Sequence, residues 1–104
     1  MFMLNVYKYS NENLKKAISL AINNQITHKE LVDWCFHYLN DVYFKDDEDN
    51  PLDDRATKIV LDIDTQWEIY ISNTFALSEL QTLEFETVKM PIEWLKKWFD
   101  LINY

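Results

Sequence analysis

The sequence predicts a mainly α-helical protein that folds as a single domain, a bundle of four or five helices. Its 104 residues are the size of one domain. Apolar residues recur at helical spacing in several stretches, and residues that commonly cap helices precede them. The chain contains no glycine, the residue that tight hairpin turns prefer. The alternative is an α+β fold with a small β element in 58–71 or 83–88.

The N-terminal part predicts one helix after an extended start. Apolar and polar residues alternate through the first nine positions, which fits a short strand or an arm packed on the core. Cap residues follow at 10–13, and asparagines at 23 and 24 close the helix, since asparagine is the next choice after glycine at a helix C-terminus. The expected core stripe is Leu14, Ala17, Ile18, Ala21 and Ile22.

A second helix is expected over about 28–44. Thr27 and Glu30 have the spacing of a capping box, which makes His28 a residue of the first turn. The apolar stripe comprises Leu31, Trp34, Cys35, Tyr38, Leu39 and Val42, and the opposite face carries Asp33, His37, Asn40 and Asp41. An acidic loop follows at 45–50.

The stretch 50–71 fits two structures. Asn50 as a cap, Pro51 at the first helical position and acids in the first turn indicate a helix. Its stripe would be Leu52, Ala56, Ile59, Val60, Ile63, Trp67, Tyr70 and Ile71. Residues 59–71 also alternate as in a strand and are rich in strand-favouring side chains. We favour the helix, because the strand needs a turn near 64–66 without glycine.

Two further helices are expected towards the C-terminus. Ser78–Gln81 repeats the capping-box spacing and begins a short helix, with a strand at 83–88 as the alternative. Pro91 suits the first position of a last helix. Its core stripe is Ile92, Leu95, Phe99 and Ile102. Trp94 and Trp98 lie on the flank of this stripe, where we favour a place in the core over an interface.

Composition excludes several classes of protein. A net charge of −8 and a pI of about 4.5 argue against binding to nucleic acid or to an anionic membrane. No apolar run approaches the roughly 18 residues that span a membrane, and 1–9 do not form a secretory signal. The single Cys35 excludes an intramolecular disulfide. We therefore expect a cytoplasmic protein, with a monomer favoured.

No catalytic, metal or cofactor site is predicted. Phosphate-binding loops, dinucleotide fingerprints and the hydrolase nucleophile elbow all need glycine. Asp33, His37 and Asp41 share a helix face and are conceivable metal ligands, but a solvated face explains them as well. The acidic loop does not fit a calcium-binding EF-hand, which requires glycine where Leu52 stands. Cys35 lies on an apolar stripe and is expected to be a buried, inert thiol.

Acidic residues are concentrated in the middle of the chain. The stretch 30–68 contains twelve of the 18 acids and three of the 10 bases, so it carries a charge of −9. One interpretation is a solvated face that keeps the protein in solution. The other is a surface that steers and contacts a basic protein. The residues expected to make contact are Asp46, Asp47, Glu48, Asp49, Asp53 and Asp54, followed by Asp62, Asp64 and Glu68.

Two segments resemble the opening of small acidic immunity proteins. The first is Leu14-Lys15-Lys16-Ala17-Ile18, and the second is Ile26-Thr27-His28-Lys29-Glu30-Leu31. With the acidic loop and the helix after it, they are similar to the immunity proteins of colicin D and of contact-dependent inhibition systems. The resemblance covers about the first two-thirds of the chain. It implies a helical protein that binds one cognate toxin, often a ribonuclease, and blocks its active site.

The expected function is therefore that of an immunity protein, which binds and neutralises a basic toxin, a nuclease in the leading interpretation. The alternative is a general protein-interaction or regulatory module whose acidic face only keeps it in solution and whose Trp94 and Trp98 edge binds the partner. A metal-dependent enzyme that uses Asp33, His37 and Asp41 is the least favoured interpretation.

Overall fold

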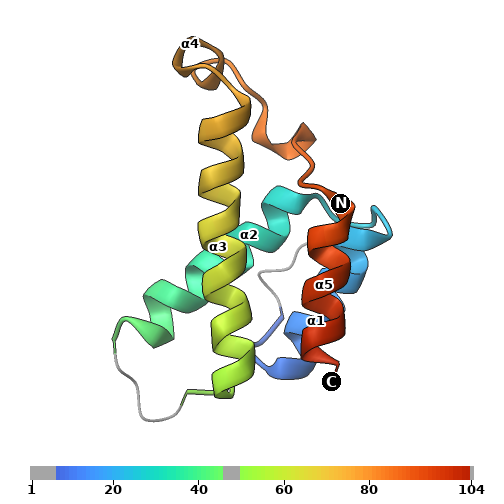
Figure 1. The fold of residues 1–104 in the computed structure, drawn as a ribbon. Coiled ribbons are helices and arrows are strands. Elements are labelled where there is room, and N and C mark those ends of the chain that lie inside the picture. Colours follow the sequence, from blue (N-terminus) through green and yellow to red (C-terminus); the bar gives the residue numbers. More distant parts are fainter. Residues whose placement is uncertain (1–6, 46–49, 104) are drawn as a thin grey trace.

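Helices make up the described part of the computed structural model, which comprises residues 7–45 and 50–103 (Figure 1). No strand occurs within these ranges, so the mainly α prediction is confirmed. Both proposed β elements are wrong: 58–71 lies inside a long helix, and 83–88 contains a single 3₁₀ turn. Of the expected N-terminal strand or arm, residues 1–6 lie outside the described residues, and 7–9 are not a strand.

Helix α1 (Asn11–Ile22) begins and ends on local hydrogen bonds. At its start the Asn13 N–H donates to Ser10 Oγ at 3.0 Å. At its end Asn24 adopts φ 60°, the left-handed conformation that usually requires glycine. The Gln25 N–H then donates to the Leu20 carbonyl at 2.9 Å, and the Asn24 N–H donates to the Ala21 carbonyl at 3.2 Å. Asparagine thus closes the helix in a glycine-free chain, as predicted.

Helix α2 (His28–Tyr38) starts at the predicted capping box. The Glu30 N–H donates to Thr27 Oγ1 at 3.0 Å, and the Thr27 N–H donates to Glu30 Oε1 at 3.3 Å. The predicted continuous helix to Phe44 is wrong in one respect. The chain widens into a π-helix, η2 (Leu39–Tyr43), and the Phe44 N–H donates to the Leu39 carbonyl at 2.8 Å. Leu39 stays buried while Tyr43 and Phe44 are exposed.

Helix α3 (Asp54–Thr74) begins three residues later than predicted. Asp53 is the cap, because its Oδ1 accepts the Ala56 N–H at 2.8 Å. Asn50 instead accepts the Leu52 N–H at 3.0 Å and the Tyr38 hydroxyl at 2.6 Å. The buried stripe of the helix is Ala56, Thr57, Ile59, Val60, Ile63, Trp67 and Ile71.

Residues 72–84 form an arm that extends beyond the body of the molecule (Figure 1). The arm contains the last turn of α3 and the short helix α4 (Leu77–Leu80), and none of its residues is buried. Helix α4 starts before the predicted Ser78, since Glu79 Oε1 accepts the Ala76 N–H at 2.9 Å. The chain returns to the core through residues 85–90, the return segment, which contains the 3₁₀ turn η3 (Phe85–Thr87).

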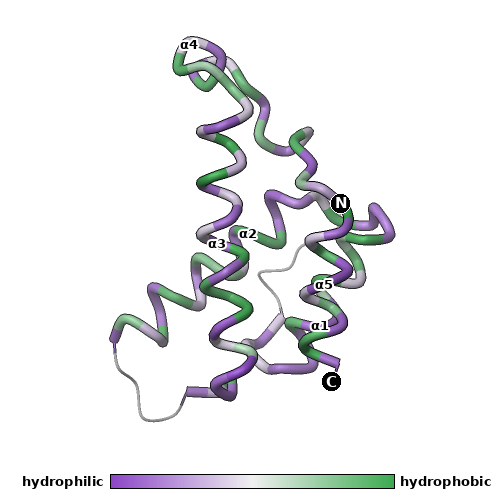
Figure 2. Tube along the Cα trace, viewed as in Figure 1, coloured by the Kyte–Doolittle hydropathy of each residue, from purple (hydrophilic) through white to green (hydrophobic). Residues whose placement is uncertain are grey.

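Helix α5 (Ile92–Ile102) packs beside α1 and also contacts α3, while α2 lies against α3. Pro91 caps α5 rather than occupying its first turn. The predicted core stripe of α5 is rotated: Leu95 and Trp98 are buried, whereas Ile92 is 38% exposed. Figure 2 shows green apolar residues along the inner sides of the helices. None of the described helices has both the length and the apolar character needed to cross a membrane.

Candidate protein-binding surface

Five of the nine acidic residues that are predicted to bind a partner belong to the part of the chain that the structure describes. Asp46, Asp47, Glu48 and Asp49 lie outside the described residues. The other five, Asp53, Asp54, Asp62, Asp64 and Glu68, are distributed over three turns or more of α3 and its cap. Their environments differ, and the differences separate acids that hold the fold together from acids that face solvent.

Asp53 joins the starts of two helices. Its Oδ2 accepts the Asn11 side-chain amide at 2.8 Å, and the Asn11 Oδ1 accepts the Asp53 N–H at 3.2 Å. The hydrogen bond from the Ala56 N–H, with a further contribution from Asn11, lowers the pKa of the Asp53 carboxyl. Both carboxylate oxygens thus have partners within the chain, and Asp53 acts as a helix cap that joins the start of α3 to the start of α1.

Asp62 accepts a hydrogen bond from the core. The indole N–H of Trp98, which is 2% exposed, donates to Asp62 Oδ2 at 2.7 Å. An N–H at such a buried site needs an acceptor, because leaving it without one costs the full desolvation of the group. Asp62 therefore provides the hydrogen-bond acceptor for the Trp98 indole and joins α3 to α5.

We predict that Asp62→Ala lowers the free energy of unfolding by about 1–3 kcal/mol, because it leaves the Trp98 N–H without its acceptor. The exposed Glu68 on the same helix provides the control, and Glu68→Ala is expected to change stability by less than about 0.5 kcal/mol. Urea denaturation followed by Trp fluorescence measures both. Equal losses for the two variants would contradict a structural role for Asp62.

Asp64 points away from Asp62. Two positions along an α-helix correspond to a separation of about 160° around its axis. Asp64 is half-buried, and desolvation raises the pKa of its carboxyl. Burial, with a smaller contribution from Asp64, also raises the pKa of the Cys35 thiol, which is fully buried. The prediction of a buried thiol is confirmed, and the raised pKa keeps it protonated and unreactive.

Besides Asp53, the described acids of the predicted set that are exposed are Asp54 and Glu68. They are fourteen positions apart, which places them about 40° apart around α3 and therefore on one outward face. Asp54 also lies in the first turn of the helix, where a negative charge interacts favourably with the helix dipole.

Sequence reasoning missed three exposed aromatic side chains on α2 and at the end of η2, Phe36, Tyr43 and Phe44, which we call the aromatic ridge. They are 50%, 39% and 65% exposed, and the Tyr43 and Phe44 rings meet edge to face with centroids 5.4 Å apart. Their positions off the buried stripe of α2 are the signal that could have identified them. Contiguous exposed apolar side chains mark interaction sites, whereas single exposed ones are normal on a protein surface.

Tyr38 fixes the ridge relative to α3. Its buried hydroxyl donates to Asn50 Oδ1 at 2.6 Å and lies 3.1 Å from Thr57 Oγ1. These contacts hold the end of α2, the chain before α3 and the first turns of α3 together. The exposed carboxylate of Asp41, within η2, accepts the Tyr9 hydroxyl at 2.9 Å. Burial and this carboxylate raise the pKa of Tyr9 to about 12.

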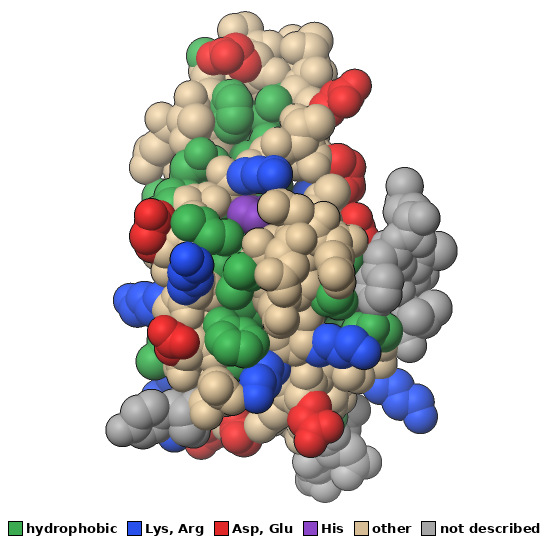
Figure 3. Space-filling model, turned by 90° about the vertical axis from the view of Figure 1, so that its right-hand side faces the viewer, with side chains coloured by type: hydrophobic (Ala, Val, Ile, Leu, Met, Phe, Trp, Pro, Cys, Tyr) green, Lys and Arg blue, Asp and Glu red, His purple; other side chains and the backbone are tan. Residues whose placement is uncertain are grey.

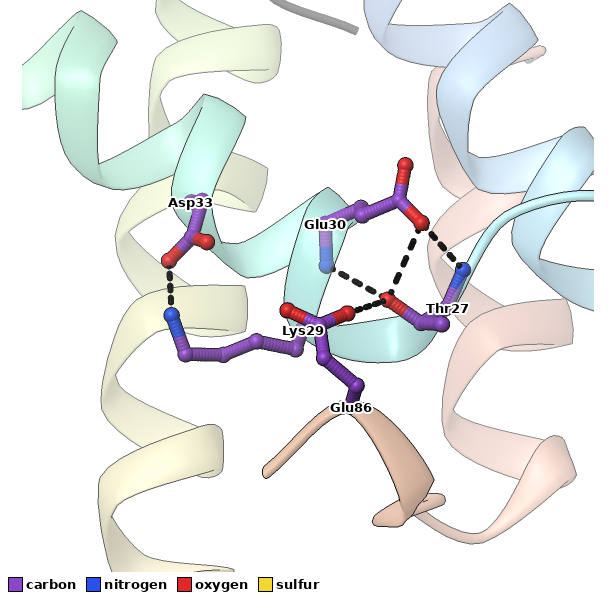
Figure 4. A network of polar contacts seen from close by, with 5 residues as sticks. All are labelled: Thr27, Lys29, Glu30, Asp33 and Glu86. Atoms are coloured by element: carbon purple, nitrogen blue, oxygen red, sulfur yellow. Dashed lines mark hydrogen bonds and ion pairs between the residues drawn. The ribbon is translucent and has the colours of Figure 1, made fainter. Parts of the chain in front are cut away.

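The residues considered as metal ligands have other partners. Asp33 is paired with Lys29, and Asp41 with Tyr9 (Figure 4 shows the first pair). His37 is exposed. Across 7–45 and 50–103, no group of three His, Cys, Asp or Glu side chains is arranged to hold a metal ion.

The binding edge formed by two tryptophans, considered in the alternative function, does not exist. Trp98 is in the core, as we favoured. Trp94 is half-buried and packs edge to face on Tyr70, with centroids 5.8 Å apart. A binding module that uses this edge would have to unpack α5.

Charge is distributed unevenly over the molecule. The chain between Lys58 and Lys89 contains no base. Its acids are Asp62, Asp64, Glu68, Glu79, Glu84 and Glu86. Four lysines lie on the adjacent helices α1 and α5: Lys15, Lys16, Lys96 and Lys97. Figure 3 shows this side of the molecule, where lysines lie among exposed apolar side chains.

A shallow depression lies along the outer face of α5, with a volume of about 430 Å³. Its lining comprises Glu93, Lys96, Lys97, Asp100 and Leu101. Two acids and two lysines on one open helix face balance each other, so the depression favours neither an anion nor a cation.

We compared the chain with protein-family models, with curated proteins and with solved structures, and none of the three comparisons found a match.

Proposed function

We propose that this protein binds a basic protein partner through the aromatic ridge and the acids that flank it, and that it acts as an immunity protein. The observation that carries the proposal is the exposure of Phe36, Tyr43 and Phe44. Aromatic side chains, phenylalanine and tyrosine among them, are enriched in the buried core of protein–protein interfaces. They lie on a helical element, which presents them with little loss of conformational freedom on binding.

The π-helical turn supports this assignment. Such turns are rare and are frequently found at functional sites. Here the wider turn keeps Leu39 in the core while Tyr43 and Phe44 face solvent. The chain thus maintains two exposed rings at a place where a regular helix was expected.

Charge favours a basic partner. The net charge is −8, and Asp41, Asp54 and Glu68 are exposed carboxylates on the elements beside the ridge. Exposed bases lie on these elements too: Lys45 follows Phe44, and Arg55 and Lys58 are on α3. The net negative charge of the protein attracts a basic protein at long range.

In its specific form the proposal names a cytoplasmic inhibitor of a basic toxin, with a nuclease as the leading candidate. A nuclease binds polyanions through a cleft of Lys and Arg. Carboxylates beside aromatic anchors are complementary in charge to such a cleft. A protein bound there through these carboxylates would exclude the nucleic-acid substrate. This form draws on the resemblance of segments 14–18 and 26–31 to immunity proteins.

Affinity capture from a lysate of the source organism tests the proposal. We expect the wild-type protein to retain a basic protein that Phe36→Ser/Phe44→Ser loses, since an anchor side chain contributes 2 kcal/mol or more, roughly a 30-fold change in affinity. Ile92→Ser/Leu101→Ser is the matched control, because these exposed apolar residues, 38% and 44% exposed, lie on α5. The control variant should retain the partner.

The specific form needs a second readout. A captured partner that degrades RNA or DNA, and is inhibited by an equimolar amount of this protein, supports an immunity function. A partner without such activity supports the general interaction module instead. Equal loss of the partner in both serine variants would overturn the assignment of the ridge as the binding surface.

A further inference from the structure

Three hydrogen bonds attach the return segment to the turn between α1 and α2. Thr27 Oγ1 donates to Glu86 Oε2 at 2.6 Å (Figure 4). Lys89 Nζ donates to Asn24 Oδ1 at 2.9 Å. The Met90 N–H donates to His28 Nδ1 at 2.9 Å. The first two bonds are exposed, while the third is buried.

The buried bond depends on the protonation of His28. The imidazole is 3% exposed, and its Nδ1 accepts the Met90 N–H, so the neutral ring carries its proton on Nε2. Protonation of Nδ1 would place two donors against each other. The Met90 N–H, which is part of a residue that is 2% exposed, would then lose its acceptor.

The surroundings of His28 oppose a positive charge. The residue occupies the first position of α2, at the positive end of the helix dipole. Burial, with a smaller contribution from Lys89, lowers the pKa of His28 from its ordinary value of 6.5. The other charged groups in the first turn of α2, on η3 and in the first turn of α5 are Lys29, Glu30, Glu86 and Glu93; Asn24 on the α1–α2 turn is neutral.

Beyond these bonds, the arm is held by apolar side chains that pack against the core but are only partly buried: Phe75, Leu80 and Leu83. No residue of 72–84 is buried, and within the return segment only Val88 and Met90 are. The helices α1, α2, α3 and α5 contain most of the remaining core. Segments with few buried contacts open at a lower free energy than the whole fold.

We propose that the His28–Met90 hydrogen bond is a proton-sensitive latch, which holds the arm and the return segment (72–90) closed at neutral pH and releases them as one unit on acidification. The sign follows from the lowered pKa of His28. In the open state, with 72–90 released, His28 binds a proton more readily than in the closed state. The closed state is therefore fully favoured above about pH 6.5, and this preference weakens as the pH falls towards and through the pKa of His28 in the closed state.

Amide hydrogen exchange, measured residue by residue by NMR, tests the latch. Between about pH 7.5 and pH 5, the range in which histidine titrates, we expect protection at 85–90 to fall by about tenfold, after correction for the intrinsic exchange rate. Protection at Val60 and Ile63, in the buried stripe of α3, should stay unchanged. A parallel loss at both places would overturn the proposal, because the arm would then open only with the whole molecule.

The chain supplies its own control, since it contains two histidines. His37 is exposed, so His37→Asn should leave the pH dependence at 85–90 intact. His28→Asn retains an acceptor near the position of Nδ1 but cannot be protonated in this range, so the pH dependence should disappear. If His28→Asn does not fold, the wild-type protein and His37→Asn still decide the question. If the pH dependence disappears in His37→Asn, then His37 rather than His28 is responsible for it, and the proposal is wrong.

Discussion

Trp98→Ala is expected to lower the free energy of unfolding by about 3–5 kcal/mol, the cost of truncating a large buried aromatic side chain. Trp98 is 2% exposed, and its indole N–H is bonded to Asp62. The substitution leaves a cavity between α3 and α5 and removes the donor that links them. Thermal or urea denaturation measures the loss.

Trp94→Ala is the matched control on the same helix. Trp94 is half-buried and pairs edge to face with Tyr70, so its loss should cost roughly 1–2 kcal/mol. Trp98→Phe separates volume from hydrogen bonding, because it retains most of the ring and removes the N–H. Costs for Trp94→Ala that equal or exceed those of Trp98→Ala would contradict the assignment of Trp98 to the core.

Tyr38→Ala is the second substitution with a large expected effect, about 3–5 kcal/mol, as for other large aromatic side chains in a core. Tyr38 is fully buried, and its hydroxyl contacts Asn50 and Thr57. The variant therefore also weakens the junction that positions the aromatic ridge relative to α3. Denaturation curves give the stability loss, and hydrogen exchange in the first turns of α3 reports on the junction.

Tyr38→Phe isolates the hydroxyl. It should cost about 1–2 kcal/mol, because the Thr57 hydroxyl and the Asn50 amide lose one shared partner. Loss of protection near Thr57 with the rest of α3 unchanged would show that the bond orders this junction. Full stability in Tyr38→Phe would contradict a role for the hydroxyl.

Local signals predicted the helices and part of their ends. The Thr27 and Glu30 capping box needs only residues three apart, and Asn24 closes α1 through bonds to the preceding turn. The start of α3 was misplaced because Asn50 and Asp53 are equally good caps. Tyr38, twelve positions from Asn50, accounts for the difference, since it engages the Asn50 side chain and Asp53 is left as the cap.

The candidate surface was less predictable, because charge alone does not reveal which acids have partners inside the fold. Asp62 bonds to Trp98 across 36 positions, and His28 bonds to Met90 across 62. Both pairs depend on how α5 and the return segment pack, which the hydrophobic periodicity of separate segments does not specify. The exposure of aromatic side chains such as Phe36 depends on how α2 packs. An analysis of apolar stripes considers only the buried face of a helix and leaves out the opposite face.

The affinity of the captured partner, measured by titration calorimetry at low and high salt, tests the proposed function most directly. The account predicts that Asp54→Lys/Glu68→Lys, which reverses the charge of the outward face of α3, weakens binding by at least about tenfold at low salt, and that high salt reduces this difference. The control Glu93→Lys/Asp100→Lys reverses two exposed acids on α5 and changes the net charge by the same amount. Beyond the effect of this change in net charge, it should alter the dissociation constant by less than about twofold. Equal weakening by the two pairs of substitutions would contradict a specific acidic binding surface beside the aromatic ridge.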